Sequence, residues 1–239
     1  MDKKTGIILG VIAAAFLLII GISLFSTERI NYDQYEPVAV YDAMYENGNT
    51  ADYIDGDPDA PIKIYEYGDY QCDACAPMNP YINELVEEYK GKVAVVFRTT
   101  IMSYHQNGVA AAAAANAAYR QGFWKEYKDL LFSNLNEWFY SNAQARQVQF
   151  EEYFVKASDG KGDLAKFRED MKSKDVQRKI DFDEAMAQKV GVNFTPNIYV
   201  EDKMIDQRNK TTDEFLKEIR AEIDRRLKEL EDSEKAEKK

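Results

Sequence analysis

The sequence of 239 residues has little cysteine and almost no histidine: Cys72, Cys75 and His105 are the complete set. A structural zinc site needs about four ligands, so these residues would have to recruit carboxylates, and the sequence disfavours such a site. A disulfide between Cys72 and Cys75 would close a very short loop. Such a bridge constrains the unfolded chain little, which also disfavours a purely structural disulfide.

Positive charge is also scarce. The chain carries 31 Lys and Arg residues against 42 Asp and Glu residues, which gives a formal net charge of −11. This balance argues against nucleic acid or an anionic lipid surface as the main partner, because both would repel the protein. No internal repeat is present, and the alanine run from Ala110 to Ala115 is typical of a helix.

One long apolar segment, residues 6–25, contains no charged residue. A helix rises about 1.5 Å per residue, so this segment spans a hydrocarbon core of roughly 30 Å. Lys3 and Lys4 precede it and acidic residues follow, which predicts a cytoplasmic N-terminus. A cleaved signal peptide is the alternative, but the apolar run is long and lacks a clear small-x-small cleavage site. We therefore expect a single-pass anchor in the cell membrane, with the rest of the chain on the extracytoplasmic side, where disulfides persist.

The two cysteines form the motif Cys72-Asp73-Ala74-Cys75, between an apolar run and a helical pattern. This spacing places both sulfurs on the first turn of a helix. The free N–H groups and the positive end of the helix dipole there favour a thiolate. The motif thus indicates thiol–disulfide exchange.

Hydrophobic periodicity predicts strands at 61–67 and 93–97, separated by a helix at 78–90, which together form a right-handed parallel βαβ unit. A short edge strand is expected at 38–40 and a turn at 55–58. Residues from 105 to about 190 are almost all helix formers, with breaks near Gly122, 135–141 and 159–162.

Strand character returns at 197–200, and the capping box Thr211-Thr212-Asp213-Glu214 begins a last helix. Apolar residues recur on that helix at Phe215, Ile219, Ile223 and Leu227, so one face is expected to cover the sheet. The charged tail from Glu231 is expected to fray.

Four features together resemble the DsbA-like thiol–disulfide oxidoreductases: residues 65–75, Pro80, residues 105–132 and residues 191–196. The resemblance extends from about residue 55 to 230. It implies an α/β thioredoxin fold with an inserted helical domain, preceded by one N-terminal transmembrane helix. The expected divisions are a cytoplasmic N-terminus (1–5), an anchor (6–25), a tether (26–58), the first part of the thioredoxin fold (59–102), the helical insertion (103–188), the second part (189–230) and a charged tail (231–239).

The resemblance also implies roles for single residues. Cys72 would be the attacking nucleophile and Cys75 the resolving thiol. Pro196 would be a cis proline facing the sulfurs, so that the backbone of Thr195 could pair with a substrate strand. Glu66 would be a buried carboxylate that relays protons to the deeper thiol. The alternative for Thr195 and Pro196 is an ordinary loop turn, and the alternative for Glu66 is an exposed carboxylate on a strand.

The dipeptide between the cysteines departs from the Pro-His of the most oxidising family members. Asp73 adds a like charge beside the thiolate, which predicts a weaker oxidant. Asp69 occupies a family motif position and is expected to cap or turn the chain, and His105 to begin the first inserted helix.

Tyr65, Tyr67 and Tyr70 lie close to the cysteines in the sequence. They could form a groove for unfolded chains, although core packing explains aromatic residues equally well.

The function implied is an oxidase that introduces disulfides into reduced exported proteins. It needs no cofactor beyond the redox-active Cys72–Cys75 disulfide and no metal. A membrane reoxidase of the DsbB or VKOR type would restore that disulfide. A reductase or isomerase remains an alternative, as does a Cu(I)-binding or redox-inert adaptor.

Overall fold

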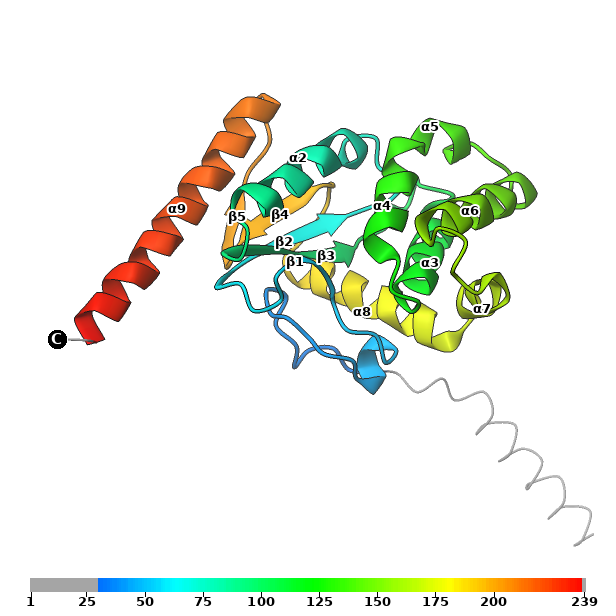
Figure 1. Cartoon of the computed structure of the whole chain (residues 1–239), viewed down its shortest axis with the longest axis horizontal. Coiled ribbons are helices and arrows are strands. Elements are labelled where there is room, and N and C mark those ends of the chain that lie inside the picture. Colours follow the sequence, from blue (N-terminus) through cyan, green and yellow to red (C-terminus); the bar gives the residue numbers. More distant parts are fainter. Residues whose placement is uncertain (1–29, 238–239) are drawn as a thin grey trace, which may run out of the picture. The chain divides into compact units, whose positions relative to one another are not determined.

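The computed structural model describes residues 30–237, and its centre is a five-stranded mixed sheet in the order β1-β3-β2-β4-β5 (Figure 1). The strands are β1 (Tyr53–Gly56), β2 (Ile62–Gly68), β3 (Val93–Thr99), β4 (Asn197–Val200) and β5 (Lys203–Ile205). Strands β2 and β3 are parallel, whereas the other neighbouring pairs are antiparallel.

Helices surround this sheet. They are the 3-10 helix η1 (Tyr45–Asn47), α2 (Cys75–Glu88), α3 (Gly108–Tyr119), α4 (Trp124–Ser133), α5 (Leu135–Trp138), α6 (Ala143–Ala157), α7 (Leu164–Asp170), α8 (Lys174–Lys189) and α9 (Thr212–Glu237). Helices α2 and α9 cover one face of the sheet and α8 the other, while α3 to α7 gather beside it (Figure 1). The predicted thioredoxin core and helical insertion are therefore both present.

Strand β2 divides its side chains between the two faces. Ile62 and Ile64 pack with α2 and α9, whereas Tyr65 and Tyr67 pack with α8. Because strand side chains alternate, Glu66 lies on the same face as Ile64, the face that α2 covers. This alternation places a carboxylate beneath the helix that carries Cys75.

The βαβ unit and the last helix agree with the sequence. In β2 and β3 the parallel register opposes Ile64 and Val95. At the start of α9, the Thr211 N–H donates to Glu214 Oε2 at 2.8 Å, and the Glu214 N–H donates back to Thr211 Oγ1 at 3.3 Å. The predicted capping box is confirmed.

The edge strand is wrongly placed by the sequence pattern. Residues 38–40 form no strand, and the edge strand is instead β1, whose Asp55 opposes Val95. Strand β1 therefore lies within the stretch assigned to a tether and includes Asp55 and Gly56 of the predicted turn. Asp and Gly are poor strand formers, so tertiary pairing with β3 decides the conformation here.

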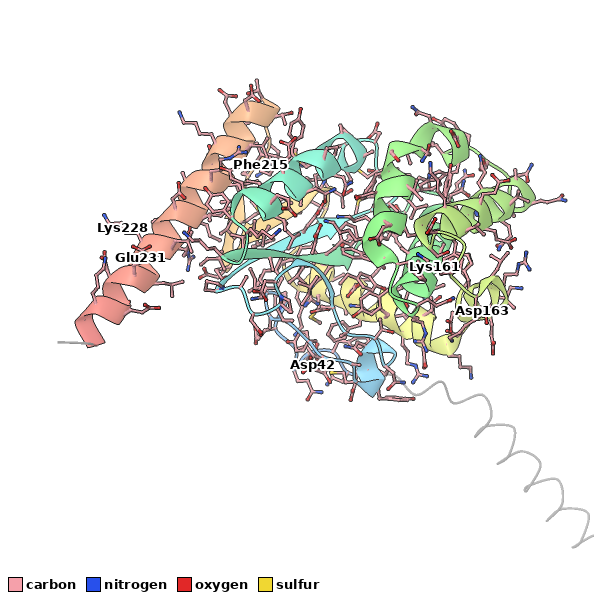
Figure 2. The ribbon with its side chains drawn as sticks, viewed as in Figure 1. Asp42, Lys161, Asp163, Phe215, Lys228 and Glu231 are labelled. Carbon is pink, nitrogen blue, oxygen red and sulfur yellow. The ribbon has the colours of Figure 1, made fainter. Side chains whose placement is uncertain are left out.

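The tail also differs from expectation, because α9 continues to Glu237 instead of fraying at Glu231. This stretch is rich in strong helix formers, and the side chains of Lys235 and Glu231 approach to 3.9 Å one turn apart. Figure 2 shows Lys228 and Glu231 on the exposed stretch of α9 beyond the buried Phe215.

A buried ion cluster joins the N-terminal segment to the α8 face of the sheet. Asp52 Oδ2 accepts from Arg98 at 2.7 Å, and Asp52 Oδ1 lies 3.0 Å from Lys179 Nζ, which also contacts Asp183 at 2.7 Å. All four side chains are fully buried. Nothing in the sequence pattern predicted this cluster.

The expected anchor at residues 6–25 lies outside the described residues. Within residues 30–237, no helix is both long and apolar enough to cross a bilayer.

Candidate active site

Both cysteines lie at the N-terminal end of α2. Cys75 is the first residue of the helix, and the carbonyl of Cys72 accepts a hydrogen bond from the Ala76 N–H at 3.2 Å. Cys72 is 5% exposed and Cys75 is fully buried, whereas Asp73 and Ala74 between them are exposed. Both thiols are free in this structure, so it describes the reduced pair.

The two thiols differ strongly in acidity. The pKa of Cys72 is lowered to about 6, chiefly by a hydrogen bond from Cys75. Burial opposes this shift, and the Thr195 side chain and the backbone N–H groups of Cys75 and Ala74 add to it. Burial, and then the hydrogen bond to Cys72, raise the pKa of Cys75 well above its usual range. Near neutral pH the outer sulfur is therefore mostly a thiolate, which is the nucleophilic form, and the inner sulfur is a thiol.

The loop before β4 meets the outer sulfur. The Thr195–Pro196 peptide bond is cis, and the Cys72 Sγ lies 3.3 Å from the carbonyl oxygen of Thr195. The Gln207 side chain donates to the carbonyl of Pro196 at 2.7 Å and holds the loop from its other side. The structure thus brings Thr195, which is 123 residues away in sequence and precedes Pro196, next to Cys72.

Glu66 lies deep in the same site. Its side chain is buried, and Oε1 has no hydrogen-bond partner. Burial is the main reason that the pKa of Glu66 rises to about 7, with the charge of Lys128 opposing the rise. The Glu66 charge in turn raises the pKa of Cys75. A carboxyl that titrates near neutral pH and senses the inner thiol can exchange protons with it.

The charges of Lys128 and Asp55 both act on Glu66, and no sequence pattern identified either residue. The Lys128 side chain is 2% exposed, and Nζ lies 3.7 Å from Asp55 Oδ2. Nζ also donates to Asn83 Oδ1 at 3.3 Å. A lysine on an amphipathic helix normally points to solvent, so only the packing of α4 against the sheet identifies this one.

Asp69 braces the turn before Cys72. Its buried carboxylate accepts from the N–H groups of Gln71 and Met102, both at 2.8 Å, and from the ring of His105. Its carbonyl accepts from the N–H of Cys72 at 3.0 Å. Asp69 does cap the turn, as expected, but His105 does not begin a helix: α3 begins at Gly108, and Asp69 binds the His105 ring in the preceding turn.

The three tyrosines around the motif do not form a groove. Tyr65, Tyr67 and Tyr70 are at most 3% exposed. Tyr65 and Tyr67 are buried on the face of β2 that α8 covers, whereas Tyr70 follows the strand and packs in the core of the helical insertion. The core alternative is therefore correct for all three.

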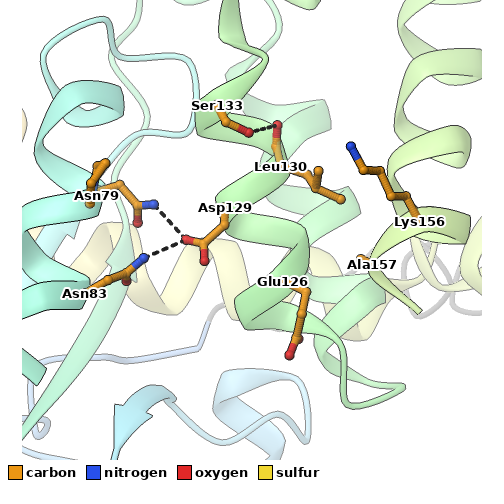
Figure 3. A pocket seen from close by; sticks show the side chains of 9 residues that line it. Asn79, Asn83, Glu126, Asp129, Leu130, Ser133, Lys156 and Ala157 are labelled. Carbon is orange, nitrogen blue, oxygen red and sulfur yellow. Dashed lines mark hydrogen bonds between the residues drawn. The ribbon is translucent and has the colours of Figure 1, made fainter. Parts of the chain in front are cut away.

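A surface groove is lined by α2, α4 and the end of α6 (Figure 3). The side-chain amides of Asn79 and Asn83 both donate to Asp129 Oδ1, at 2.7 and 3.1 Å. Neither cysteine lines this groove. Its hydrogen bonds tie the cysteine-bearing helix to the helical insertion.

Across residues 30–237, no three or more His, Cys, Asp and Glu side chains converge in a way that could hold a metal ion.

Comparison with known proteins places these features in a family. A family model described as thioredoxin matches residues 49–221. The probable disulfide bond formation protein D of Bacillus cereus is 29% identical over 221 residues, covering 87% of this chain and 94% of that protein. Disulfide bond formation protein D of Bacillus subtilis is 28% identical over 160 residues, covering 63% of this chain and 68% of that protein.

Solved structures share the fold. Oxidised BdbD from Bacillus subtilis superposes with a TM-score of 0.61 at 22% identity, covering 80% of this chain and 98% of that one. A thioredoxin-like oxidoreductase from Silicibacter pomeroyi gives a TM-score of 0.59 at 23% identity, covering 74% of this chain and 92% of that one. The family match includes Glu66, both cysteines and the Thr195–Pro196 loop, and the chain belongs to the thioredoxin family.

Proposed function

We propose that this protein is a thiol–disulfide oxidoreductase that introduces disulfide bonds into exported proteins. The observation that carries the proposal is the acidity difference within one helical turn: the pKa of Cys72 falls to about 6 while that of Cys75 rises. A pair of this kind has one sulfur that forms a bond with a substrate and one that closes the pair again. The Bacillus relatives named for disulfide bond formation support the oxidising direction.

In the oxidising reaction, a substrate thiolate attacks the Cys72 sulfur of the Cys72–Cys75 disulfide. The bond between the two sulfurs breaks, a mixed disulfide forms between substrate and Cys72, and Cys75 leaves as a thiolate. A second substrate thiolate then attacks the substrate sulfur of the mixed disulfide. This step releases Cys72 as a thiolate and leaves a disulfide in the substrate, so two electrons pass from the substrate to the pair.

Glu66 supplies the proton that Cys75 needs when it leaves. A buried thiolate with a raised pKa is a poor leaving group unless it is protonated, and Glu66 still carries its proton on about half of the molecules near pH 7. When the pair is reoxidised, the same carboxylate takes the proton back from Cys75. Lys128 limits how far burial raises the pKa of Glu66, which keeps both protonation states accessible.

The loop at Thr195 and Pro196 positions the substrate. The Thr195 carbonyl already lies within 3.3 Å of the Cys72 sulfur, so a substrate strand that hydrogen-bonds to the Thr195 backbone would bring its own cysteine to Cys72. Main-chain pairing of this kind is independent of side chains and suits an enzyme that acts on many sequences.

The size of the acidity shift bears on how strong an oxidant the pair is. Relative to a thiol with a pKa of 9.0, a pKa of about 6 stabilises the reduced form at pH 7 by about 1.4 kcal/mol, or about 30 mV for a two-electron couple. This is a modest contribution. It supports the weaker oxidising power that the Asp73-Ala74 dipeptide predicts.

The proposed activity also indicates where the protein acts. Disulfide formation requires an oxidising compartment, and the names of the Bacillus relatives refer to disulfide bond formation. We place the catalytic domain outside the cytoplasm, held by residues 6–25 as a membrane anchor. A quinone-coupled membrane protein of the DsbB or VKOR type would return the pair to its disulfide form.

The decisive experiment is the reduction potential of the Cys72–Cys75 pair, measured on the full chain in detergent by equilibration with glutathione buffers. A potential clearly above the thioredoxin value of about −270 mV, with oxidation of a reduced, unfolded substrate protein, supports an oxidase. A value at or below −270 mV overturns this direction and makes the protein a reductase. The Cys72→Ser variant should be inactive, and full activity in it would refute the mechanism.

A further inference from the structure

Four aromatic side chains near the cysteines form a continuous chain of ring contacts. The ring centroids are 4.5 Å apart for Tyr104 and His105, 6.1 Å for His105 and Phe139, and 4.6 Å for Phe139 and Tyr140. The two ends are open to solvent: Tyr104 is 73% exposed and Tyr140 is 92% exposed. We call these four residues the aromatic rim.

The aromatic rim is attached to the turn that carries the outer sulfur. The Asp69 carboxylate binds the ring of His105 at 2.6 Å, and the Asp69 carbonyl accepts from the N–H of Cys72 at 3.0 Å. Toward the other end, Gln71, which directly precedes Cys72, donates from its side chain to the carbonyl of Phe139 at 2.7 Å. The two inner residues of the rim, His105 and Phe139, are thus tied to the turn that leads into Cys72.

Buried amide side chains hold the backbone that carries the rim. The Asn107 side chain donates to the carbonyls of Trp138, Phe139 and Ser141, at 3.0 to 3.1 Å. The Asn107 N–H donates to the Gln71 side chain at 2.6 Å. Gln71 and Asn107 are only 2% and 4% exposed.

Asp69 fixes the remaining part of the rim, because its carboxylate binds the His105 ring at 2.6 Å. The exposed rings therefore stand on a backbone that a buried polar network holds in place. A preorganised surface of this kind loses little conformational entropy when it binds a partner. Exposed aromatic rings in such a setting are typical of binding surfaces.

We propose that the aromatic rim binds an extended segment of a reduced polypeptide that carries a large apolar side chain next to its reacting cysteine. The occupant follows from continuity with the Cys72 site, because a mixed disulfide on Cys72 holds the flanking substrate residues beside these rings. Charge further restricts the substrate segments that fit. Asp73 is exposed in the same turn as Cys72 and disfavours an acidic side chain next to the substrate cysteine. This inference rests on the proposed function and adds the side-chain preference of its substrates.

The test compares three thiols as reductants of the oxidised full-length protein: a cysteine peptide with Phe before the cysteine, the same peptide with Ser there, and glutathione. The variant is Tyr104→Ser with Tyr140→Ser. Its matched controls are Tyr104→Phe with Tyr140→Phe, which keeps both rings, and Tyr81→Ser, which removes an exposed tyrosine of α2. Rates of disulfide loss are measured by acid quench and thiol counting.

The wild type should react about tenfold faster with the Phe peptide than with the Ser peptide. In the double Ser variant the ratio should fall to within about twofold, while the rate with glutathione and the ratios in both controls stay unchanged. An unchanged ratio in the double Ser variant, or a wild type without preference, overturns the inference and leaves the proposed function intact. A wild type that reacts with none of the three thiols instead refutes the proposed function.

Discussion

The carboxylate of Asp69 accepts a hydrogen bond from Nδ1 of His105 at 2.6 Å, and both side chains are almost completely buried. The contact joins the turn that precedes Cys72 to the loop that leads into the helical insertion. Together with the hydrogen bonds of Met102 and Asn107 to the same turn, it couples these two parts of the fold close to the reactive sulfur.

Removing the imidazole should destabilise the protein, because Asp69 would keep its buried charge and lose one of three donors. We expect His105→Ala to lower the free energy of unfolding by about 2 kcal/mol. The measurement is urea denaturation of the reduced protein at pH 7. His105→Asn is the matched control, since its amide nitrogen can take the place of Nδ1 and should recover most of the loss. A cost below about 0.5 kcal/mol for the alanine variant would contradict the prediction.

The low pKa of Cys72 should depend on the neighbouring thiol, because the hydrogen bond from Cys75 is its largest cause. Cys75→Ala removes that donor and should raise the pKa of Cys72 clearly above 6. Cys75→Ser keeps a hydroxyl donor and should leave it low. Thiolate absorbance at 240 nm, followed from pH 4 to 10, measures both. Equal titration curves for the two variants would contradict the prediction and show that the Thr195 side chain and the backbone N–H groups stabilise the thiolate without a donor at position 75.

Glu66 should make stability fall as pH rises. Its pKa in the folded protein is raised from 4.5 to about 7, so the folded state holds this proton more strongly than the unfolded state. Stability from this group is fully present below pH 4.5 and is lost as the pH rises through 7. Gln cannot ionise, so the stability of Glu66→Gln relative to wild type should grow across this window, by about 3 kcal/mol in total.

The measurement is the difference in unfolding free energy between the two proteins at pH 4, 5, 6, 7 and 8. Both should carry Cys72→Ser and Cys75→Ser, which removes the thiol titrations from the comparison. A difference that stays flat over this range would mean that Glu66 titrates normally and is no candidate for proton exchange with Cys75.

The sequence predicted the parts of the site that depend on local pattern. Cys72 and Cys75 are recognisable from their spacing. The strand that carries Glu66 follows from its run of β-branched and aromatic residues. Thr195 and Pro196 were placed beside the sulfurs only through the family resemblance, because no local pattern specifies a contact between residues 123 positions apart.

What the sequence missed depends on tertiary packing. Tyr65 and Tyr67 look like a surface groove until α8 covers their face of the sheet. Conversely, Tyr104 and Tyr140 stand in irregular segments without periodicity. Only the buried contacts of Asp69 and Gln71 show that their neighbours His105 and Phe139 are fixed to the turn before Cys72. Strand β1 was missed for the same reason, since Asp55 and Gly56 adopt an extended conformation only against β3.

The buried ion cluster gives the last prediction. Lys179 contacts both Asp52 and Asp183, and all three side chains are fully shielded from water. Replacing Lys179 with Met leaves Arg98 as the cation next to two buried carboxylates. Breaking a buried pair by removing one partner is strongly destabilising, so we expect a loss of about 3 to 5 kcal/mol.

The matched control is Lys161→Met, which removes a surface ion pair whose side chains are 73% and 86% exposed and should cost less than about 1 kcal/mol. Thermal unfolding of the oxidised proteins at pH 7 compares the two. Because the cluster joins β3, α8 and the segment before β1, its loss should also expose residues 36–50 to limited proteolysis before the sheet unfolds. Equal stability of the two variants would show that Arg98 alone neutralises both carboxylates, and that the N-terminal segment is held by its aromatic contacts with Phe182 instead.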